Sequence, residues 1–128
     1  VILSDLAPRE ALQALVSSLE LPAGVFAAGL AATVVGLGFI GIHPMITAAI
    51  LAGTFASITV PGLSHANIVL ALAGGWVCIA GIGPLMSSLV LAAAVMGRRP
   101  SDLGLKWNGR FSAVAIGLWL VALLFIRI

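Results

Sequence analysis

Residues 38–62, GFIGIHPMITAAILAGTFASITVPG, contain the pattern that decides the predicted fold. Gly41 and Pro44 interrupt one apolar run, and Pro61 and Gly62 interrupt the next. No charged residue lies in this stretch, and the charge-free region around it extends over 21–97. A second charge-free region covers 111–126. Since a membrane-spanning helix needs about 20 apolar residues, these two regions predict several helical segments within a bilayer.

The overall composition excludes several classes of protein. Hydrophobic residues make up 62% of the chain and charged residues only 8%, whereas a soluble domain has about 25% charged residues. The chain therefore lacks the polar surface of a cytoplasmic enzyme, and its net charge of +2 does not favour binding to nucleic acid. Its single cysteine, Cys78, cannot form a disulfide within the chain. The composition predicts an all-α integral membrane protein whose first partner is the lipid bilayer.

The charges divide the chain into two predicted regions. Residues 1–20 carry three acidic residues and one basic residue, and the spacing of their apolar residues predicts an amphipathic interfacial helix or a linker. Ser4 or Asp5 can cap this helix, and Pro8 suits its first turn. Residues 21–128 form the predicted polytopic membrane domain. Its five helical segments, transmembrane or re-entrant, are predicted at about 22–40, 45–58, 68–80, 85–97 and 111–126.

Small residues recur at every fourth position in two of the predicted helices. The first helix contains Gly24, Ala28, Ala32 and Gly36, and the second contains Ala49, Gly53 and Ser57. Such a stripe lets a neighbouring helix approach closely. The stripes therefore predict helix packing, and a change of Gly36 to leucine is expected to break a complex that uses this face.

Two of the helix breaks form an internal repeat with an offset of 40 residues. Gly41-Ile42-His43-Pro44 in the first copy corresponds to Gly81-Ile82-Gly83-Pro84 in the second. The backbone groups freed by such breaks must find partners inside a bilayer. Paired broken helices at the midplane are typical of transport sites. The alternative is a pair of tight turns at the membrane surface, which gives five ordinary crossings.

The segment 98–110 predicts the orientation of the chain. It carries four basic residues and one acidic residue, and the positive-inside rule places such a loop in the cytoplasm. The last helix then ends outside. The predicted localisation is an integral protein of a bacterial inner membrane.

The polar side chains at the breaks are the candidates for function. The sequence has no metal-ligand spacing and no nucleophile–base–acid set, so neither an enzyme nor a metal site is predicted. Hydroxyl, amide and freed carbonyl groups suit a sodium ion, and helix N-termini suit an anion. The alternative is that these groups bond to their own helices. The candidates for binding a substrate or ion are His43, Thr47, Thr59, Ser64, His65, Asn67 and Ser87.

Residues 38–45, GFIGIHPM, resemble the entry to a late helix in the ion transporter superfamily, which includes the divalent anion–sodium symporters. The segment 59–67 occupies a place similar to the clip that holds sodium and carboxylate in that family. The Ser-Asn-Thr signature and the paired prolines of the family are absent. The resemblance implies that Thr59, Ser64 and Asn67 contact the ion or the substrate. It also implies that the chain is the C-terminal portion of an elevator-like, usually dimeric transporter.

Two functional hypotheses follow. The first is a secondary transporter, or the C-terminal part of one, that moves a small anionic metabolite with sodium as the only expected cofactor. It predicts a homo-oligomer or the remainder of a longer chain as partner. The second is a small accessory or assembly subunit of a larger membrane complex. The paired Gly-Ile-x-Pro breaks favour the transporter, and the small-residue stripes favour the subunit.

Overall fold

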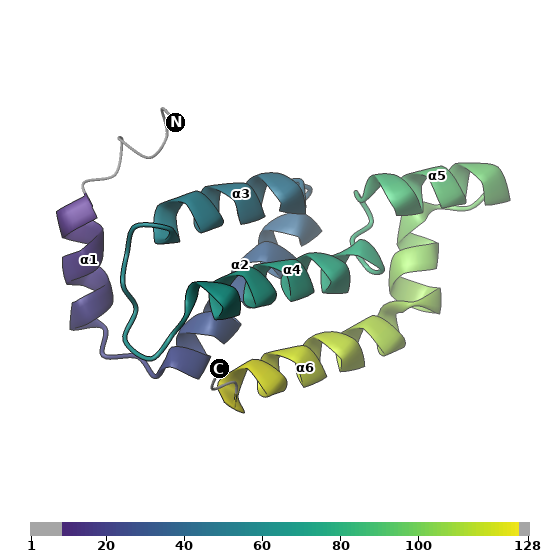
Figure 1. The fold of residues 1–128 in the computed structure, drawn as a ribbon. Coiled ribbons are helices and arrows are strands. Elements are labelled where there is room, and N and C mark those ends of the chain that lie inside the picture. The colour runs from purple at the N-terminus through teal and green to yellow at the C-terminus, as the bar shows by residue number, and fades with distance from the viewer. Residues whose placement is uncertain (1–8, 126–128) are drawn as a thin grey trace.

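The computed structural model describes residues 9–125, and this part of the chain folds into helices (Figure 1). Six are α-helices, and one short π-helical segment precedes the last of them. The predicted cap at Ser4 or Asp5, the predicted role of Pro8 and the predicted helix end at 126 lie outside the described residues. The elements are α1 (Arg9–Ser18), α2 (Ala23–Phe39), α3 (Pro44–Phe55), α4 (His65–Ala80), α5 (Ser87–Met96), η2 (Asp102–Trp107) and α6 (Gly109–Phe125).

Helices α2 and α4 form the centre of the fold and run parallel, because α3 returns the chain between them (Figure 1). Glycines make this pair close-packed. A Cβ atom on Gly75 would lie 2.8 Å from the carbonyl oxygen of Ala31, and one on Gly38 would lie 2.8 Å from a side-chain carbon of Ile79. The apolar side chains between these helices stabilise the fold by about 25 cal/mol for each Å² of surface that folding removes from water. The core cluster consists of Ala27, Leu30, Ala31, Val34, Ile68, Ala71, Leu72 and Leu123.

Helix α6 closes the core by packing antiparallel to α4 and α2. Gly74 of α4 lies directly against the indole of Trp119, and Gly24 of α2 lies against the backbone of Leu124. Helix α1 covers the other side of this end. Its Val16 packs with Ile58 and Val60 from the segment between α3 and α4. The N-terminal end of α2 is therefore enclosed by α1, by that segment and by the end of α6.

The two copies of the repeat have different backbone conformations. After α2 the chain makes a Schellman turn: Gly41 has a φ of +99°, and the amide of Ile42 donates to the carbonyl of Leu37 at 3.0 Å. Pro44 then opens α3 at once, which folds back on α2 and α4. After α4, Gly81 is in the right-handed region, and α5 begins only at Ser87. As a result α5 projects away from the core (Figure 1).

The two breaks nevertheless lie side by side. A Cβ atom on Gly41 would lie 2.7 Å from Cδ1 of Leu85. This proximity follows from the parallel arrangement of α2 and α4, which brings the segments after both helices to the same end of the pair.

The predicted integral membrane fold is wrong, because no helix among the described residues is both long enough and apolar enough to cross a bilayer. The longest, α2 and α6, have 17 residues each, or roughly 25 Å at the rise of an α-helix, against a hydrocarbon core of about 30 Å. The Gly and Pro breaks divide the apolar region 21–97 into helices of this length or shorter. The five predicted membrane segments are corrected on this finding.

The localisation built on those segments is corrected with them. The prediction of an integral inner-membrane protein, with 98–110 in the cytoplasm and the C-terminus outside, required helices that cross the bilayer. The described helices do not meet that requirement. The basic segment itself is partly helical, since η2 occupies Asp102–Trp107.

The predicted small-residue stripe on α2 is rotated away from the packed face. The buried residues of α2 are Gly24, Ala27, Leu30, Ala31, Val34 and Gly38. These follow the helical period, whereas a spacing of four residues turns by about 40° at each step and leaves the packed face. Gly36 therefore stands in open space, with nothing within 4 Å of a Cβ atom built on it.

Candidate functional site

The seven candidate residues do not all lie together in the structure. His43 and Thr47 stand at the start of α3, and Ser87 starts α5. The other four candidates, Thr59, Ser64, His65 and Asn67, lie on the segment between α3 and α4 and on the first turn of α4. Because α3 folds back along α4, the start of α3 and the start of α4 are at opposite ends of that pair (Figure 1).

His43 caps α3. Its Nδ1 accepts a hydrogen bond from the backbone amide of Met45 at 3.2 Å, so one free amide of the first turn is satisfied. The imidazole also meets the indole of Trp76 from α4 edge to face, with 6.4 Å between the ring centroids. Thr47, one turn along α3, is buried, and its hydroxyl has no hydrogen-bond partner among the described residues.

The segment before α4 is closed by local hydrogen bonds. The Ser64 hydroxyl accepts from the backbone amide of Asn67 at 3.2 Å and caps α4. His65 Nε2 lies 3.2 Å from the carbonyl oxygen of Ala56. Both side chains therefore stabilise the turn between α3 and α4. The helix breaks at Pro61 and Gly62 belong to the same turn, in which Gly62 has a φ of +75°.

Asn67 is the most unusual polar group of the fold. Its side chain is completely buried, and neither its amide oxygen nor its amide nitrogen has a hydrogen-bond partner within the described part of the chain. Asn67 shares one face of α4 with Ala71 and Gly75, and this face packs against α2. A buried amide without partners costs free energy, because it has lost its hydrogen bonds to water.

Replacing Asn67 with leucine, a side chain of similar size and branching, is expected to raise the free energy of unfolding by about 1–3 kcal/mol. Ser64→Ala is the matched control, because it removes a cap from the same turn and is expected to lower that free energy by about 1 kcal/mol. Denaturant unfolding followed by helix circular dichroism measures both changes. A destabilised Asn67→Leu protein would contradict this expectation.

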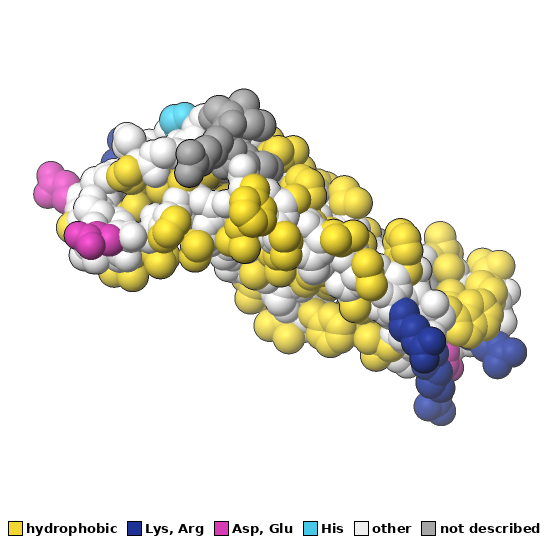
Figure 2. All heavy atoms as spheres, turned by 90° about the horizontal axis from the view of Figure 1, so that it is seen from below, with side chains coloured by type: hydrophobic (Ala, Val, Ile, Leu, Met, Phe, Trp, Pro, Cys, Tyr) yellow, Lys and Arg dark blue, Asp and Glu magenta, His cyan; other side chains and the backbone are white. Residues whose placement is uncertain are grey.

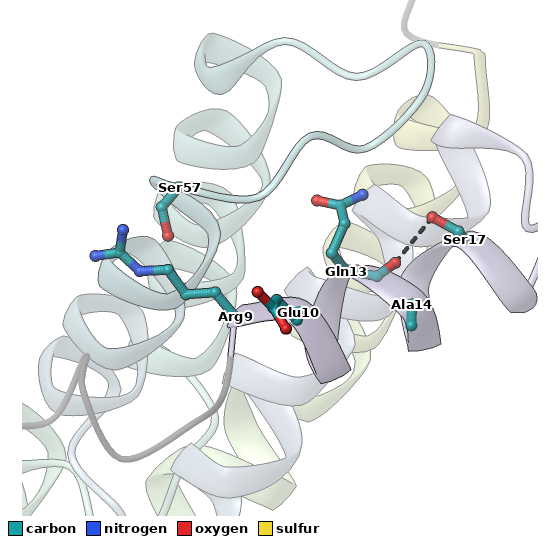
Figure 3. A pocket seen from close by; sticks show the side chains of 6 residues that line it. All are labelled: Arg9, Glu10, Gln13, Ala14, Ser17 and Ser57. Carbon is teal, nitrogen blue, oxygen red and sulfur yellow. Dashed lines mark hydrogen bonds between the residues drawn. The ribbon is translucent and has the colours of Figure 1, made fainter.

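A polar hollow of about 530 Å³ opens where α1 faces the end of α3 (Figure 3). Arg9, Gln13 and Ser17 recur every four residues along α1 and so share one face. Figure 3 shows the guanidinium of Arg9 extended toward Ser57, and Ser17 donating to the carbonyl of Gln13, at 2.8 Å. The hollow is lined by Arg9, Glu10, Gln13, Ala14, Ser17 and Ser57.

Gln13 attaches α1 to the rest of the fold at this hollow. Its Nε2 donates to the carbonyl oxygen of Thr59 at 3.0 Å, and its Oε1 accepts from the amide of Thr59 at 3.1 Å. This pair of bonds satisfies the backbone of an otherwise irregular segment. Gln13 was not among the predicted candidates, because it lies outside the charge-free regions. The signal was available in the four-residue spacing of polar groups on α1.

Basic residues gather at the far end of the molecule, around η2 (Figure 2). Lys106 Nζ lies 2.7 Å from a carboxylate oxygen of Asp102, and this hydrogen bond holds the pKa of Asp102 below its usual value. Asn108 Nδ2 donates to the carbonyl oxygen of Gly81 at 2.8 Å and ties this end to the second break. The remaining bases there are Arg98, Arg99 and Arg110.

An apolar groove of about 520 Å³ runs between α4 and α6, lined mainly by Gly74, Val77, Cys78, Leu118 and Trp119. Burial raises the pKa of the Cys78 thiol. A thiol with a raised pKa is protonated at neutral pH and is therefore a weak nucleophile. The groove offers shape and apolar contact rather than reactivity.

No known protein family, curated protein or solved structure matches this chain. Within residues 9–125, no three His, Cys, Asp or Glu side chains lie close enough together to hold a metal ion. Sodium binding through hydroxyl, amide and carbonyl oxygens, and the resemblance to the ion transporter superfamily, stay predictions.

Proposed function

We propose that this chain acts by packing, as an accessory or assembly subunit of a larger helical complex. The observation that carries the proposal is the apolar belt, the exposed large hydrophobic side chains of α2, α3, α4, α5 and α6. Residues 21–97 and 111–125 contain no charge, and side chains such as Ile46, Val77 and Leu91 are more than half exposed. Exposed apolar surface on this scale is typical of a face that a partner covers.

The charges support the same proposal by their placement. Figure 2 shows charged side chains at the two ends of the elongated molecule, mainly acidic at one end and mainly basic at the other, with hydrophobic side chains between them. Arg9 at the first end and Asp102 at the second are the exceptions. The acidic residues are Glu10 and Glu20 near α1, and the basic group surrounds η2. Charged groups outside an apolar contact zone resemble the polar rim of a protein interface.

The positions of the candidate binding residues favour packing over transport. A transport site needs the ligands of one solute to converge, but the candidates at the start of α3 and those at the start of α4 lie at opposite ends of that pair. Three of the side chains have local hydrogen-bond contacts: His43 and Ser64 cap helices, and His65 Nε2 lies 3.2 Å from the carbonyl oxygen of Ala56. Sodium-coupled transport of an anion stays a prediction that this geometry does not strengthen.

The outer face of α2 is suited to a neighbouring helix. Gly29 and Gly36 are exposed, and a Cβ atom on either would meet nothing within 4 Å. A helix without side chains at these positions lets a second helix approach its backbone closely. The exposed Val25 and Phe39 flank the two glycines and supply apolar contact at both ends of the face.

Gly36→Leu tests the proposal, because leucine fills the space that a partner helix would need while touching nothing in the chain itself. We expect the variant, purified from cells that make it, to elute in a smaller assembly than the original chain on size exclusion. Its helix content should be retained and its unfolding midpoint should not fall, because leucine has a higher helix propensity than glycine. Ala14→Leu is the matched control, since it adds bulk at an exposed position in the polar hollow. Equal elution of all three proteins would contradict the proposal.

A further inference from the structure

The exposed face of α6 carries a row of large apolar side chains that we name the α6 seam: Phe111, Val114, Leu118, Val121 and Phe125. Each of them is between 52% and 78% exposed. Their separations alternate between three and four residues, which is the spacing that aligns side chains along the contact line of two coiled helices. The opposite side of α6 packs into the core through Leu123. Helix α6 therefore has two apolar faces: one is packed in the core, and the α6 seam is exposed.

The order of side-chain types in the α6 seam is the same from either end: Phe-Val-Leu-Val-Phe, with Leu118 at the centre. Phe111 and Phe125 each lie seven residues from Leu118, whereas Val114 lies four residues before it and Val121 three residues after it. A two-fold symmetric contact requires a surface that complements itself. If a second copy lies antiparallel, Phe111 faces Phe125 of that copy, and Leu118 faces its own equivalent. Gly117 beside Leu118 stands in open space, so the two backbones can approach at the centre.

The apolar groove between α4 and α6 adds a hole next to the seam. Leu118 and Val77 form its edges, and the indole of Trp119 is part of its wall. In coiled-helix packing, a side chain of one helix inserts into a hole between residues of the other. The groove, at about 520 Å³, gives the side chains of a second copy additional apolar surface beside the seam.

The charges at the two ends distinguish the antiparallel pair from the parallel one. Arg110 lies in the first turn of α6 beside the basic residues around η2, and the far end of α6 packs against the start of α2 at Gly24, four residues after Glu20. An antiparallel pair brings Arg110 and the basic residues of each copy toward Glu20 of the other. A parallel pair brings the basic ends together, which is unfavourable.

We infer that the α6 seam binds a second copy of this chain in an antiparallel, two-fold symmetric contact centred on Leu118. This inference rests on the proposed function and names one partner for the apolar belt. The order of the seam residues and the charges at the two ends of α6 both fit a second copy in the antiparallel direction, and the groove adds apolar contact beside the seam.

Disulfide cross-linking measures the register of this contact. The starting protein is the full 128-residue chain with Cys78→Ser, which removes its single native thiol. A cysteine at 118 lies next to the symmetry axis, where two Cα atoms can come within the 4.4–6.8 Å that a disulfide needs. On mild oxidation in detergent, Leu118→Cys should give a covalent dimer of twice 13.0 kDa. Phe111→Cys alone should give none, but its mixture with Phe125→Cys should give one.

Two results would overturn the inference. Efficient cross-linking of Phe111→Cys with itself would mean that the helices pair in parallel. Absence of any dimer with Leu118→Cys, while circular dichroism shows an intact fold, would mean that the seam is not a contact between copies. In that second case the proposed function still stands if Gly36→Leu reduces the size of the native assembly, so the two failures can be told apart.

Discussion

Gly24→Ala is expected to lower the free energy of unfolding by about 3 kcal/mol. A Cβ atom on Gly24 would overlap the carbonyl oxygen of Leu124 and lie 2.7 Å from its Cα atom. Because both are backbone atoms, no rotation of a side chain relieves the overlap, and α2 and α6 must separate. Denaturant unfolding followed by helix circular dichroism measures the change.

Gly29→Ala, on the same helix, is the control for this substitution. Nothing lies within 4 Å of a Cβ atom at Gly29, so alanine there adds no contact and improves helix propensity by up to about 1 kcal/mol. The two variants should therefore move the unfolding midpoint in opposite directions. Equal effects would contradict the close approach of α2 and α6.

Leu123→Ala is expected to lower the free energy of unfolding by about 2–5 kcal/mol, the usual range when a buried leucine is truncated and leaves a cavity. Leu123 is completely buried in the core cluster. The matched variant is Leu91→Ala on α5, where the leucine is 68% exposed, and its effect should stay within about 0.5 kcal/mol. A large loss from Leu91→Ala with a small loss from Leu123→Ala would mean that the core lies elsewhere.

The positions of the helices were largely readable from glycine and proline. Helix α2 runs from Ala23 to Phe39, against a predicted range of 22–40, because Gly41 supplies the left-handed residue that ends it. Helix α4 begins at His65, three residues before the predicted start at 68, because the hydroxyl of Ser64 caps it. Both ends depend on local chemistry, which a sequence displays directly.

The arrangement of the helices could not be read in the same way. The repeat Gly-Ile-x-Pro occurs twice, yet α3 folds back and α5 projects, because only Pro44 is the first residue of a helix. The membrane prediction rested on the apolar composition. Composition gives the proportion of hydrophobic residues in the chain, but it does not determine how long each helix is. The breaks at Gly41, Pro61 and Gly81 fix that length.

For the candidate site, too, the sequence predicted the kind of residue but not the arrangement of the residues in space. The sequence identified Asn67 and Thr47 as polar groups in apolar surroundings, and both are buried. It did not show that they stand apart, since their separation depends on the direction of α3 relative to α4. Gln13 and the polar hollow were overlooked because their contact with Thr59 joins residues 46 positions apart.

The central claim is that this chain functions by covering its apolar belt with other helices. Native mass spectrometry of the chain, purified together with what binds it from cells that make it, tests it most directly. We expect a defined assembly heavier than 13.0 kDa, retained by the original chain and by Ala14→Leu. A single species at 13.0 kDa at every protein concentration, with the helices intact, would contradict it.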